Sequence, residues 1–451
     1  MSQKPIDQMR ADAKDLFIEA INAVDAFRVT KCSLAINGES LIARDILGRT
    51  VTFDLTRFKR ILVLGFGKAA GLMAHATEDI LQDRISEGIV ITARGHNIPP
   101  LRKTRMAEAG HPVPDAHSLK GTQCIAELAK SAGNHDLVIC LISGGGSAFF
   151  TLPCEDIALV DLQQLTEQLL RCGANIREIN TVRKHLSQIK GGRFARLAYP
   201  ATMVSLIISD VIGDRLDVIA SGPTVPDGTT FQDAHTVLAK YRLVDKVPVS
   251  VRKHIEWGIE GKIEETPRQD DMVFQKVKNL IIAHNLTALR AIVQKAKQMG
   301  YYSFILSSMI EGDTRHAAQG FATMIKALAD SSSFNRKPFC IVAGGEMTTR
   351  VSGKGKGGRN TDFCLALAPL IHGMKKVVVL SAGTDGIDGT TDAAGAIIDG
   401  ATSHKALNLK LDIDAALTEN DSYTLLKKLD ELLITGSTQT NVMDIQIIMI
   451  G

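Results

Sequence analysis

The sequence has few of the features that mark a secreted, membrane or nucleic-acid-binding protein. Its formal net charge is only +3 over 451 residues, so charge gives no support for binding to nucleic acid or to a membrane surface. The seven cysteines are scattered without a C-x-x-C pair, which favours reduced, buried thiols over disulfides or a zinc site. No apolar run reaches the ~18–20 residues of a membrane span, and the N-terminus lacks a signal-peptide pattern. We therefore expect a cytoplasmic protein that binds neither nucleic acid nor membrane.

Several widespread catalytic signatures are missing as well. The chain contains no G-x-x-x-x-G-K-[ST] loop, no H-R-D and D-F-G pair, no H-E-x-x-H and no G-x-S-x-G. These absences exclude the P-loop nucleotide-binding proteins, the protein kinases, the H-E-x-x-H metalloproteases and the α/β-hydrolases that carry those motifs.

The chain does contain a regular alternation of short apolar runs and longer helical patterns, which predicts parallel sheets covered by helices. Strands are expected at 61–64, 88–92, 137–142 and 202–208, and again at 280–283, 302–306, 339–342 and 377–380. The fold class is therefore α/β, with two domains that each have a mainly parallel sheet flanked by helices, the first of them Rossmann-like. We place these domains at 1–258 and 272–451, joined by a polar linker at 259–271.

Five of the expected strands run into loops that are rich in glycine or carry acids. These loops are GFGKAAG (65–71), SGGGS (143–147), SDVIGD (209–214), GGEMTTRVSGKGKGGRN (344–360) and SAGTDGIDG (381–389). Because ligands bind beyond the carboxyl ends of parallel strands, we expect one active site in a cleft between the domains, lined by loops of both.

The glycine run in SGGGS predicts an anion-binding nest. Between Ser143 and Ser147, bare glycines leave successive backbone N–H groups free for phosphate oxygens, and the serine hydroxyls add donors. A tight turn without a ligand is the alternative interpretation.

The loop at 65–71 matches G-x-G-x-x-A through Gly65, Gly67 and Ala70, which is typical of dinucleotide-binding folds. That fingerprint also needs an acidic residue after the next strand to hold the ribose, and this chain has Arg94 there. The missing acid disfavours NAD binding. Lys68, beside the bare amides, is instead suited to phosphate oxygens or a carboxylate.

Carboxylates and basic groups complete the set of candidates. Asp210 follows an expected strand directly, so it can bind magnesium through water or accept a hydroxyl proton. Asp385 lies in the loop after another strand and is a second candidate magnesium ligand. Lys190 ends a basic helical stretch, and Arg359 ends a flexible glycine-rich loop that is typical of a phosphate clamp.

Taken together, these motifs resemble the type-2 glycerate kinases, a two-domain family whose second half is often called the MOFRL domain. The resemblance covers nearly the whole chain and rests on VLGFGKAA, AGHPVPD, LISGGGSA, VRKHLSQIKGGRFA, SDVIGD, IASGPTVPD, GGRN, GTDGIDGTTDAAGA, NDSY and TGSTQTNVMD, in that order. Two departures occur: Thr361-Asp362 stands where the family usually has Gln-Glu after GGRN, and Ser437 replaces a proline. The first departure keeps an acid but shortens it, so the sequence does not predict which contacts Asp362 makes.

The resemblance implies ATP-dependent phosphorylation of D-glycerate with Mg²⁺. We expect a monomer or a homodimer. The expected product is 2-phosphoglycerate, with 3-phosphoglycerate as the alternative. Lys68 and Arg359 are the leading catalytic candidates, joined by Asp210. Contacts to phosphate or nucleotide are expected from Ser143, Gly144, Gly145, Gly146, Ser147, Gly67, Lys190, Glu346 and Asn360. A hydroxypyruvate reductase that uses NAD(P)H and a non-catalytic sensor of a phosphate ligand are the competing hypotheses.

Overall fold

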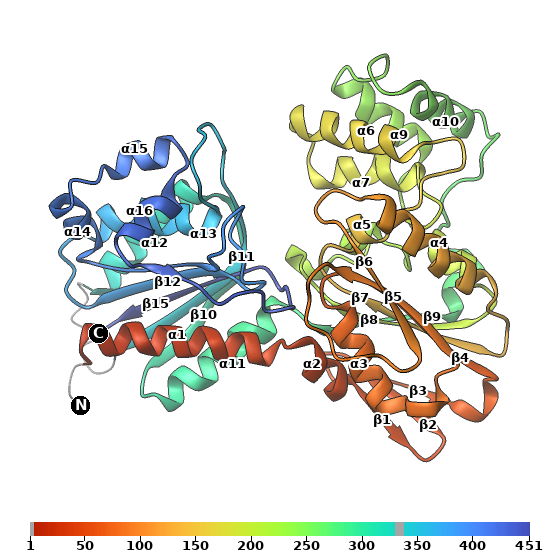
Figure 1. Cartoon of the computed structure of the whole chain (residues 1–451), viewed down its shortest axis with the longest axis horizontal. Helices are drawn as coiled ribbons and strands as arrows, with labels where there is room; N and C mark the ends of the chain where they lie inside the picture. The colour runs from red at the N-terminus through yellow and green to blue at the C-terminus, as the bar shows by residue number, and fades with distance from the viewer. Residues whose placement is uncertain (1–3, 330–337) are drawn as a thin grey trace. The chain divides into compact units, whose positions relative to one another are not determined.

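The structure is a computed structural model that describes residues 4–329 and 338–451. It divides the chain into two units (Figure 1): an N-terminal unit, Ala26–Ala283, and a C-terminal unit that joins the residues up to Asp25 to those from His284 onward. The expected boundary at 259–271 differs from this division. Strand β9 (Val277–Ala283) pairs with β8 (Thr202–Ile208) and so belongs to the first sheet. The expected cleft between the domains stays a prediction.

The N-terminal unit is built on a parallel sheet with the strand order β6-β5-β4-β7-β8-β9. Its remaining strands are β4 (Arg60–Phe66), β5 (Glu87–Ala93), β6 (Thr104–Ala109) and β7 (Asp136–Ile142). Strand β7 is buried along its whole length, as expected for a strand that helices cover on both faces. The Rossmann-like prediction is confirmed for this unit.

Helices and a small hairpin sheet surround the parallel sheet. The helices nearest to it are α2 (Ala26–Ser33), α3 (Ala70–Leu81), α4 (Ala116–Lys130), α5 (Gly146–Phe149) and α8 (Arg193–Ala198), with 3-10 turns η1 (Leu55–Arg57), η2 (Gln82–Arg84), η3 (Ile212–Asp214), η4 (Ile219–Ser221) and η5 (Met272–Lys276). The hairpin sheet consists of β1 (Leu34–Asn37), β2 (Ser40–Arg44) and β3 (Thr50–Asp54).

Four further helices of this unit form a group with an apolar core of its own. They are α6 (Leu159–Arg171), α7 (Ile176–His185), α9 (Phe231–Lys240) and α10 (Val249–Ile259), which lie together in Figure 1. Leu165, Val182, Ala234 and Val251 are fully buried in the cluster between them. The group therefore packs as a helical layer that the sequence pattern did not separate from the sheet.

The C-terminal unit has a mixed sheet with the order β10-β11-β15-β12-β13-β14. The strands are β10 (Tyr302–Asp313), β11 (Phe339–Thr348), β12 (Val377–Gly383), β13 (Gly395–Asp399), β14 (Leu432–Leu433) and β15 (Asp444–Ile450). Only β10 and β11 pair in parallel, so the expectation of a mainly parallel second sheet is wrong. Parallel neighbours need a long crossover, usually a helix; α12 supplies one between β10 and β11, whereas β12 and β13 are joined by a loop without a helix.

Helices cover both faces of this second sheet. They are α1 (Ile6–Ala23), α11 (Asn285–Gln298), α12 (Thr314–Ala329), α13 (Arg359–Leu367), α14 (Thr402–Asn408), α15 (Ile413–Thr418) and α16 (Ser422–Lys428), with the 3-10 turn η7 (Ala368–Ile371). Figure 1 shows α1 and α11 on one face and α12, α13 and α16 on the other. Helix α1 joins this unit because its apolar face, which includes Leu16 and Phe17, is buried there.

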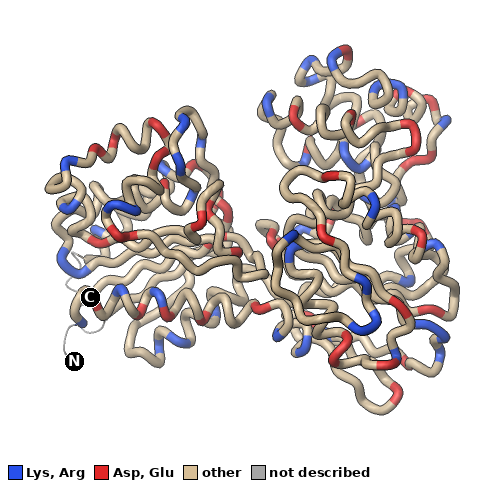
Figure 2. Tube along the Cα trace, viewed as in Figure 1, with Lys and Arg blue, Asp and Glu red and all other residues tan. Residues whose placement is uncertain are grey.

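Acidic and basic residues are interspersed along the trace of both units (Figure 2). Within residues 4–329 and 338–451, no helix is both long enough and apolar enough to cross a membrane.

Candidate active site

The glycine-rich loops of the N-terminal unit lie where the strand order of its sheet reverses. From β4 the chain builds outward through β5 to β6, and from β7 it builds in the opposite direction through β8 to β9. The crevice between the carboxyl ends of β4 and β7 is therefore the topological switch point, where open α/β sheets bind their ligands. Lys68 follows β4, Ser143 follows β7 and Asp210 follows β8, so the structure brings all three to this edge.

The loops after β4 and β7 are hydrogen-bonded to each other. The backbone N–H of Lys68 donates to the carbonyl of Gly144 at 2.8 Å, and that of Ala69 donates to the Ser143 hydroxyl at 2.9 Å. Gly67 has φ +124°, and a Cβ there would lie 2.4 Å from the Ser143 carbonyl oxygen. Only glycine permits this close approach. Backbone contacts therefore fix Lys68 beside the second glycine loop.

The second loop presents backbone amides that the protein does not use. Gly145 adopts a left-handed conformation with φ +77° and precedes the short helix α5. Gly146 donates its N–H to the Ser143 carbonyl at 3.2 Å. Within the described part of the chain, the N–H groups of Gly144, Gly145 and Ser147 have no acceptor. Three such amides in one turn suit an anion.

Lys190 holds the glycine loop through hydrogen bonds to its backbone. Its side chain is buried, and its Nζ donates to the carbonyls of Ser147 at 2.9 Å and Phe150 at 3.0 Å. The Ser147 hydroxyl lies 2.9 Å from that of Ser221, which donates to Asn180 Oδ1 at 3.1 Å. Lys190 thus lies next to the glycine loop with its amine engaged by backbone, and its expected contact to phosphate stays a prediction. Sequence reasoning missed Ser221 and Asn180.

The two predicted metal ligands lie in different units. Asp210 is half-buried at the end of β8, and Asp385 follows β12, where its Oδ1 accepts the N–H of Ile387 at 3.1 Å. Across residues 4–329 and 338–451, no group of three or more His, Cys, Asp or Glu side chains could hold a metal ion. Magnesium in phosphoryl-transfer sites takes one or two carboxylates and completes its shell with water and substrate phosphate. A single carboxylate at either position fits that pattern.

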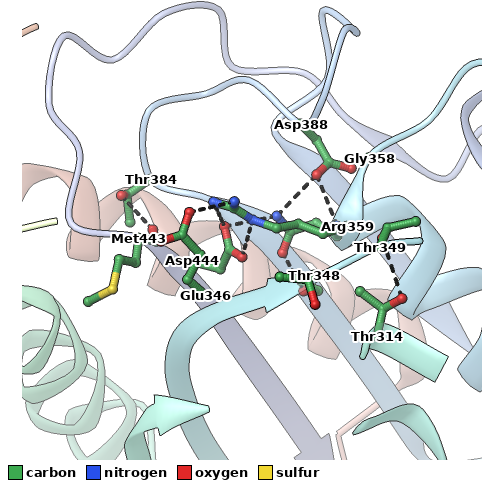
Figure 3. Close-up of polar contacts among 12 residues, drawn as sticks. Thr314, Glu346, Thr348, Thr349, Gly358, Arg359, Thr384, Asp388, Met443 and Asp444 are labelled. Atoms are coloured by element: carbon green, nitrogen blue, oxygen red, sulfur yellow. Dashed lines mark hydrogen bonds and ion pairs between the residues drawn. The ribbon is translucent and has the colours of Figure 1, made fainter. Parts of the chain in front are cut away.

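In the C-terminal unit, Arg359 lies at the centre of an ion-pair network (Figure 3). Its Nε and Nη2 donate to the two carboxylate oxygens of Asp444 at 2.6 and 3.0 Å, and its Nη1 donates to Glu346 Oε1 at 2.7 Å. Burial alone would lower the pKa of Arg359, but Asp444 and Glu346 raise it, so the guanidinium stays charged. With three of its N–H groups engaged, the guanidinium has two left for a ligand.

Asp388 holds the start of helix α13, just behind Arg359. Its carboxylate accepts the backbone N–H groups of Asn360 at 2.9 Å and Thr361 at 2.8 Å, together with the Thr361 hydroxyl at 2.8 Å. A Cβ on Gly358 would lie 2.4 Å from Asp388 Cγ, so glycine is needed where the two segments meet. Asn360 also donates to Asp444 at 3.1 Å, which places this predicted residue in the Arg359 network.

Asp444 is the main residue that sequence reasoning missed. It is fully buried at the first position of β15, and in the strand register it lies between Gly345 of β11 and Gly383 of β12. The signal was a lone carboxylate directly before the apolar run IQIIMI. A charge at the edge of a buried strand needs a partner, and Arg359 is that partner.

Asp362, at the position that departs from the family pattern, has a structural environment. It is buried and accepts a hydrogen bond from the Ser422 hydroxyl. Burial raises its pKa, against the opposing effect of that hydroxyl. Thr361 beside it is engaged by Asp388, so both residues of this departure from the family sequence point into the packed start of α13.

The buried carboxylate of Asp444 predicts a pH dependence. Burial raises its pKa to about 6, although Arg359 and Asn360 donate to it. As the pH falls through 6, Asp444 takes up a proton and holds Arg359 less firmly. If the activity needs an oriented Arg359, kcat should fall on the acid side with an apparent pKa near 6. The measurement is a kcat profile from pH 5 to 9 with saturating substrates.

The Asp444→Asn variant is the control for this profile. It should have a lower kcat throughout and should lack the acid limb, because the titrating group is gone. The stability of the wild type should rise as the pH falls from 6 to about 4, while its kcat falls. The reason is that the pKa of Asp444 in the folded chain lies above the unfolded value of 3.8, so proton uptake favours the folded state. An unchanged acid limb in Asp444→Asn would assign it to another group.

Two family models match the chain. Residues 12–256 match a domain of unknown function, DUF4147, and residues 339–444 match the MOFRL family. Together they span both units.

Curated relatives and a solved structure are similar over most of the chain. Glycerate 2-kinase of Pyrococcus horikoshii is 40% identical over 96% of this chain and 95% of its own. The solved structure of glycerate kinase from Thermotoga maritima superimposes with a TM-score of 0.84 at 38% identity, covering 99% of this chain and 100% of that one. A protein of Agrobacterium vitis, named provisionally as a hydroxypyruvate reductase, is 40% identical over 87% of both chains.

Proposed function

The chain belongs to the type-2 glycerate kinase family, and from that premise we propose that it transfers the γ-phosphate of ATP to D-glycerate. The enzyme class is a phosphotransferase with an alcohol group as acceptor. The proposed product is 2-phosphoglycerate. The hydroxyl of D-glycerate at carbon 2 is then the attacking group.

One observation carries the proposal: the amides of Gly144, Gly145 and Ser147 have no acceptor in the described chain, and their loop lies at the switch point of a parallel sheet. Phosphoryl transfer requires mainly positioning and neutralisation of charge. Unused amides in a turn provide both for phosphate oxygens, without a nucleophilic side chain. A turn that served only folding would leave these amides at the start of α5 to water, and it is the position of the loop at the switch point that favours a ligand.

The charged candidates then take separate roles. Lys68, fixed by the backbone contacts of its loop, neutralises a phosphate oxygen. Asp210 accepts the proton of the attacking hydroxyl. Arg359, oriented by Asp444 and Glu346, uses its remaining N–H groups on the oxygens of the transferring group, whose charge is spread over the plane that a guanidinium matches.

We propose Mg²⁺ as the companion of ATP, with Asp210 and Asp385 as candidate ligands through water. When bound, the ion supplies neutralisation of the phosphate charge. The contribution of the chain is the placement of the two carboxylates at the ends of β8 and β12.

Phosphorus NMR of the product formed from ATP, magnesium and D-glycerate tests activity and position together. We expect the resonance of 2-phosphoglycerate, because the proposal places the carbon-2 hydroxyl at the transferred phosphate. The resonance of 3-phosphoglycerate would contradict the position, and the absence of any new phosphoester would contradict the kinase.

The rival reductase predicts that NADH binds. In the structure, the position after β5 that would hold a ribose-binding acid is Arg94, whose Nη2 donates to Asp115 at 2.6 Å. We therefore expect ATP with magnesium to raise the melting temperature. At 100 times its Kd, ATP should add about 2.7 kcal/mol to the free energy of unfolding. NADH at equal concentration should leave the melting temperature unchanged. Oxidation of NADH with hydroxypyruvate would favour the reductase.

A further inference from the structure

Within the described residues, Lys190 at the glycine loop and Arg183, whose charge acts on Lys190, lack an acidic partner. Arg183, on α7, is half-buried, and its guanidinium makes one weak contact, from Nε to the Thr166 hydroxyl at 3.4 Å. Lys190 is only 2% exposed and donates to two backbone carbonyls. In the part of the chain that the structure describes, neither forms an ion pair with a carboxylate.

Lys184, the residue after Arg183, is a buried cation that does have a carboxylate partner. Lys184 lies on the same helix and is equally buried, and its Nζ lies 3.3 Å from Asp227 Oδ1. Burial and the positive charge of Arg183 lower the pKa of Lys190 to about 7. A half-buried and a buried cation that repel each other are costly unless an anion accompanies them.

The same helix face contacts the glycine loop. Asn180 lies three residues before Arg183, so both point from one side of α7. Asn180 Oδ1 accepts from the Ser221 hydroxyl, which lies against the Ser147 hydroxyl. Ser221 and Ala220 have φ +63° and +50°, a left-handed conformation that is unfavourable for residues other than glycine. Such strain is concentrated at functional sites.

We infer that Arg183 binds the carboxylate of the hydroxy-acid substrate, with the Asn180 amide as a further donor. The inference rests on the proposed function, since it names the residue that recognises the acid end of the acceptor. A planar guanidinium pairs with a carboxylate through two parallel hydrogen bonds. The bound carboxylate is the counter-ion that the described chain does not provide. The unused amides of the glycine loop are left for the phosphates of the donor.

Arg183→Gln tests the inference, with Arg177→Gln as its matched control. Arg177 lies on the same helix but is exposed, so its replacement removes the same charge away from the loop. Arg183→Gln should raise KM for D-glycerate by about 10- to 100-fold, the scale of a lost charge-assisted hydrogen bond. KM for ATP should stay within about twofold, because the donor phosphates use other groups. Arg177→Gln should change neither KM.

Stability separates this role from a structural one. Because Arg183 repels Lys190 and has no acidic partner among residues 4–329 and 338–451, its replacement by glutamine should leave the melting temperature unchanged or raise it. A structural arginine would lower it. Arg183→Lys, which keeps the charge but loses the planar fork, should recover part of the affinity.

Two further measurements keep the inference independent of the proposed reaction. Calorimetric titration with D-glycerate alone should detect binding by the wild type and a 10- to 100-fold weaker binding by Arg183→Gln, whether or not phosphate is transferred. Glycerol, which has a hydroxymethyl group in place of the carboxylate, should be a far poorer phosphate acceptor than D-glycerate for the wild type. In Arg183→Gln, the preference for D-glycerate over glycerol should be 10- to 100-fold smaller. A raised KM for ATP, a lowered melting temperature with both KM values unchanged, or equal D-glycerate affinity in both proteins would overturn the inference.

Discussion

Replacing Arg359 with alanine should lower kcat by about 10²–10⁴, the scale of a lost group that stabilises charge in the transition state. It should also destabilise the protein. Asp444 is fully buried, and the change removes the two N–H donors that Arg359 gives to its carboxylate and leaves only that of Asn360. Breaking a buried pair on one side costs about 3–5 kcal/mol. Steady-state kinetics and urea unfolding of the same preparations measure the two effects.

A double variant separates the loss of activity from the loss of stability. Arg359→Ala with Asp444→Asn removes the unpaired charge as well, so part of the lost stability should return while kcat stays low. Arg350→Ala is the matched control, because Arg350 lies in the same loop region but is exposed. It should be close to wild type in both respects. A double variant that regained activity would mean that Arg359 only neutralises Asp444.

The N-terminal sheet could be predicted from the sequence because each of its features is local. An apolar run such as 137–142 followed by glycines identifies both the strand and the loop after it. Parallel neighbours then follow from the helices between strands. The predicted Lys68, Ser143 and Asp210 therefore meet at one edge, since the carboxyl ends of parallel strands share that edge.

The C-terminal site could be predicted only in part, because it depends on a pairing between distant segments. Arg359 and Glu346 lie in recognisable motifs. Asp444 contacts Arg359 because the last strand, β15, inserts between β11 and β12 in antiparallel orientation. Nothing in the alternation of strands and helices specifies that insertion. The helix pattern of α1 likewise does not reveal that it packs with residues almost three hundred positions later.

Gly145→Ala should lower kcat by at least about 10²-fold while the protein stays folded. The added methyl group would lie 2.8 Å from the His111 ring and 2.9 Å from that of Phe149, and these two rings stack with their centroids 5.4 Å apart. Alanine also disfavours φ +77°, at about 1–2 kcal/mol. The loop must therefore shift, and a displacement near 1 Å of groups that position a substrate can cost about 10²-fold in rate.

Gly38→Ala isolates the backbone contribution. Gly38 has φ +59° and open space around its Cβ position, so alanine there meets the same conformational penalty without a clash. It should lower the melting temperature slightly and leave kcat unchanged. Combining Gly145→Ala with His111→Ala removes one of the two rings that the methyl group meets, so part of kcat should return if displacement of the amides is the cause. A single Gly145→Ala variant with normal turnover would show instead that the loop is an ordinary turn, because a phosphate nest cannot lose its geometry and keep its rate.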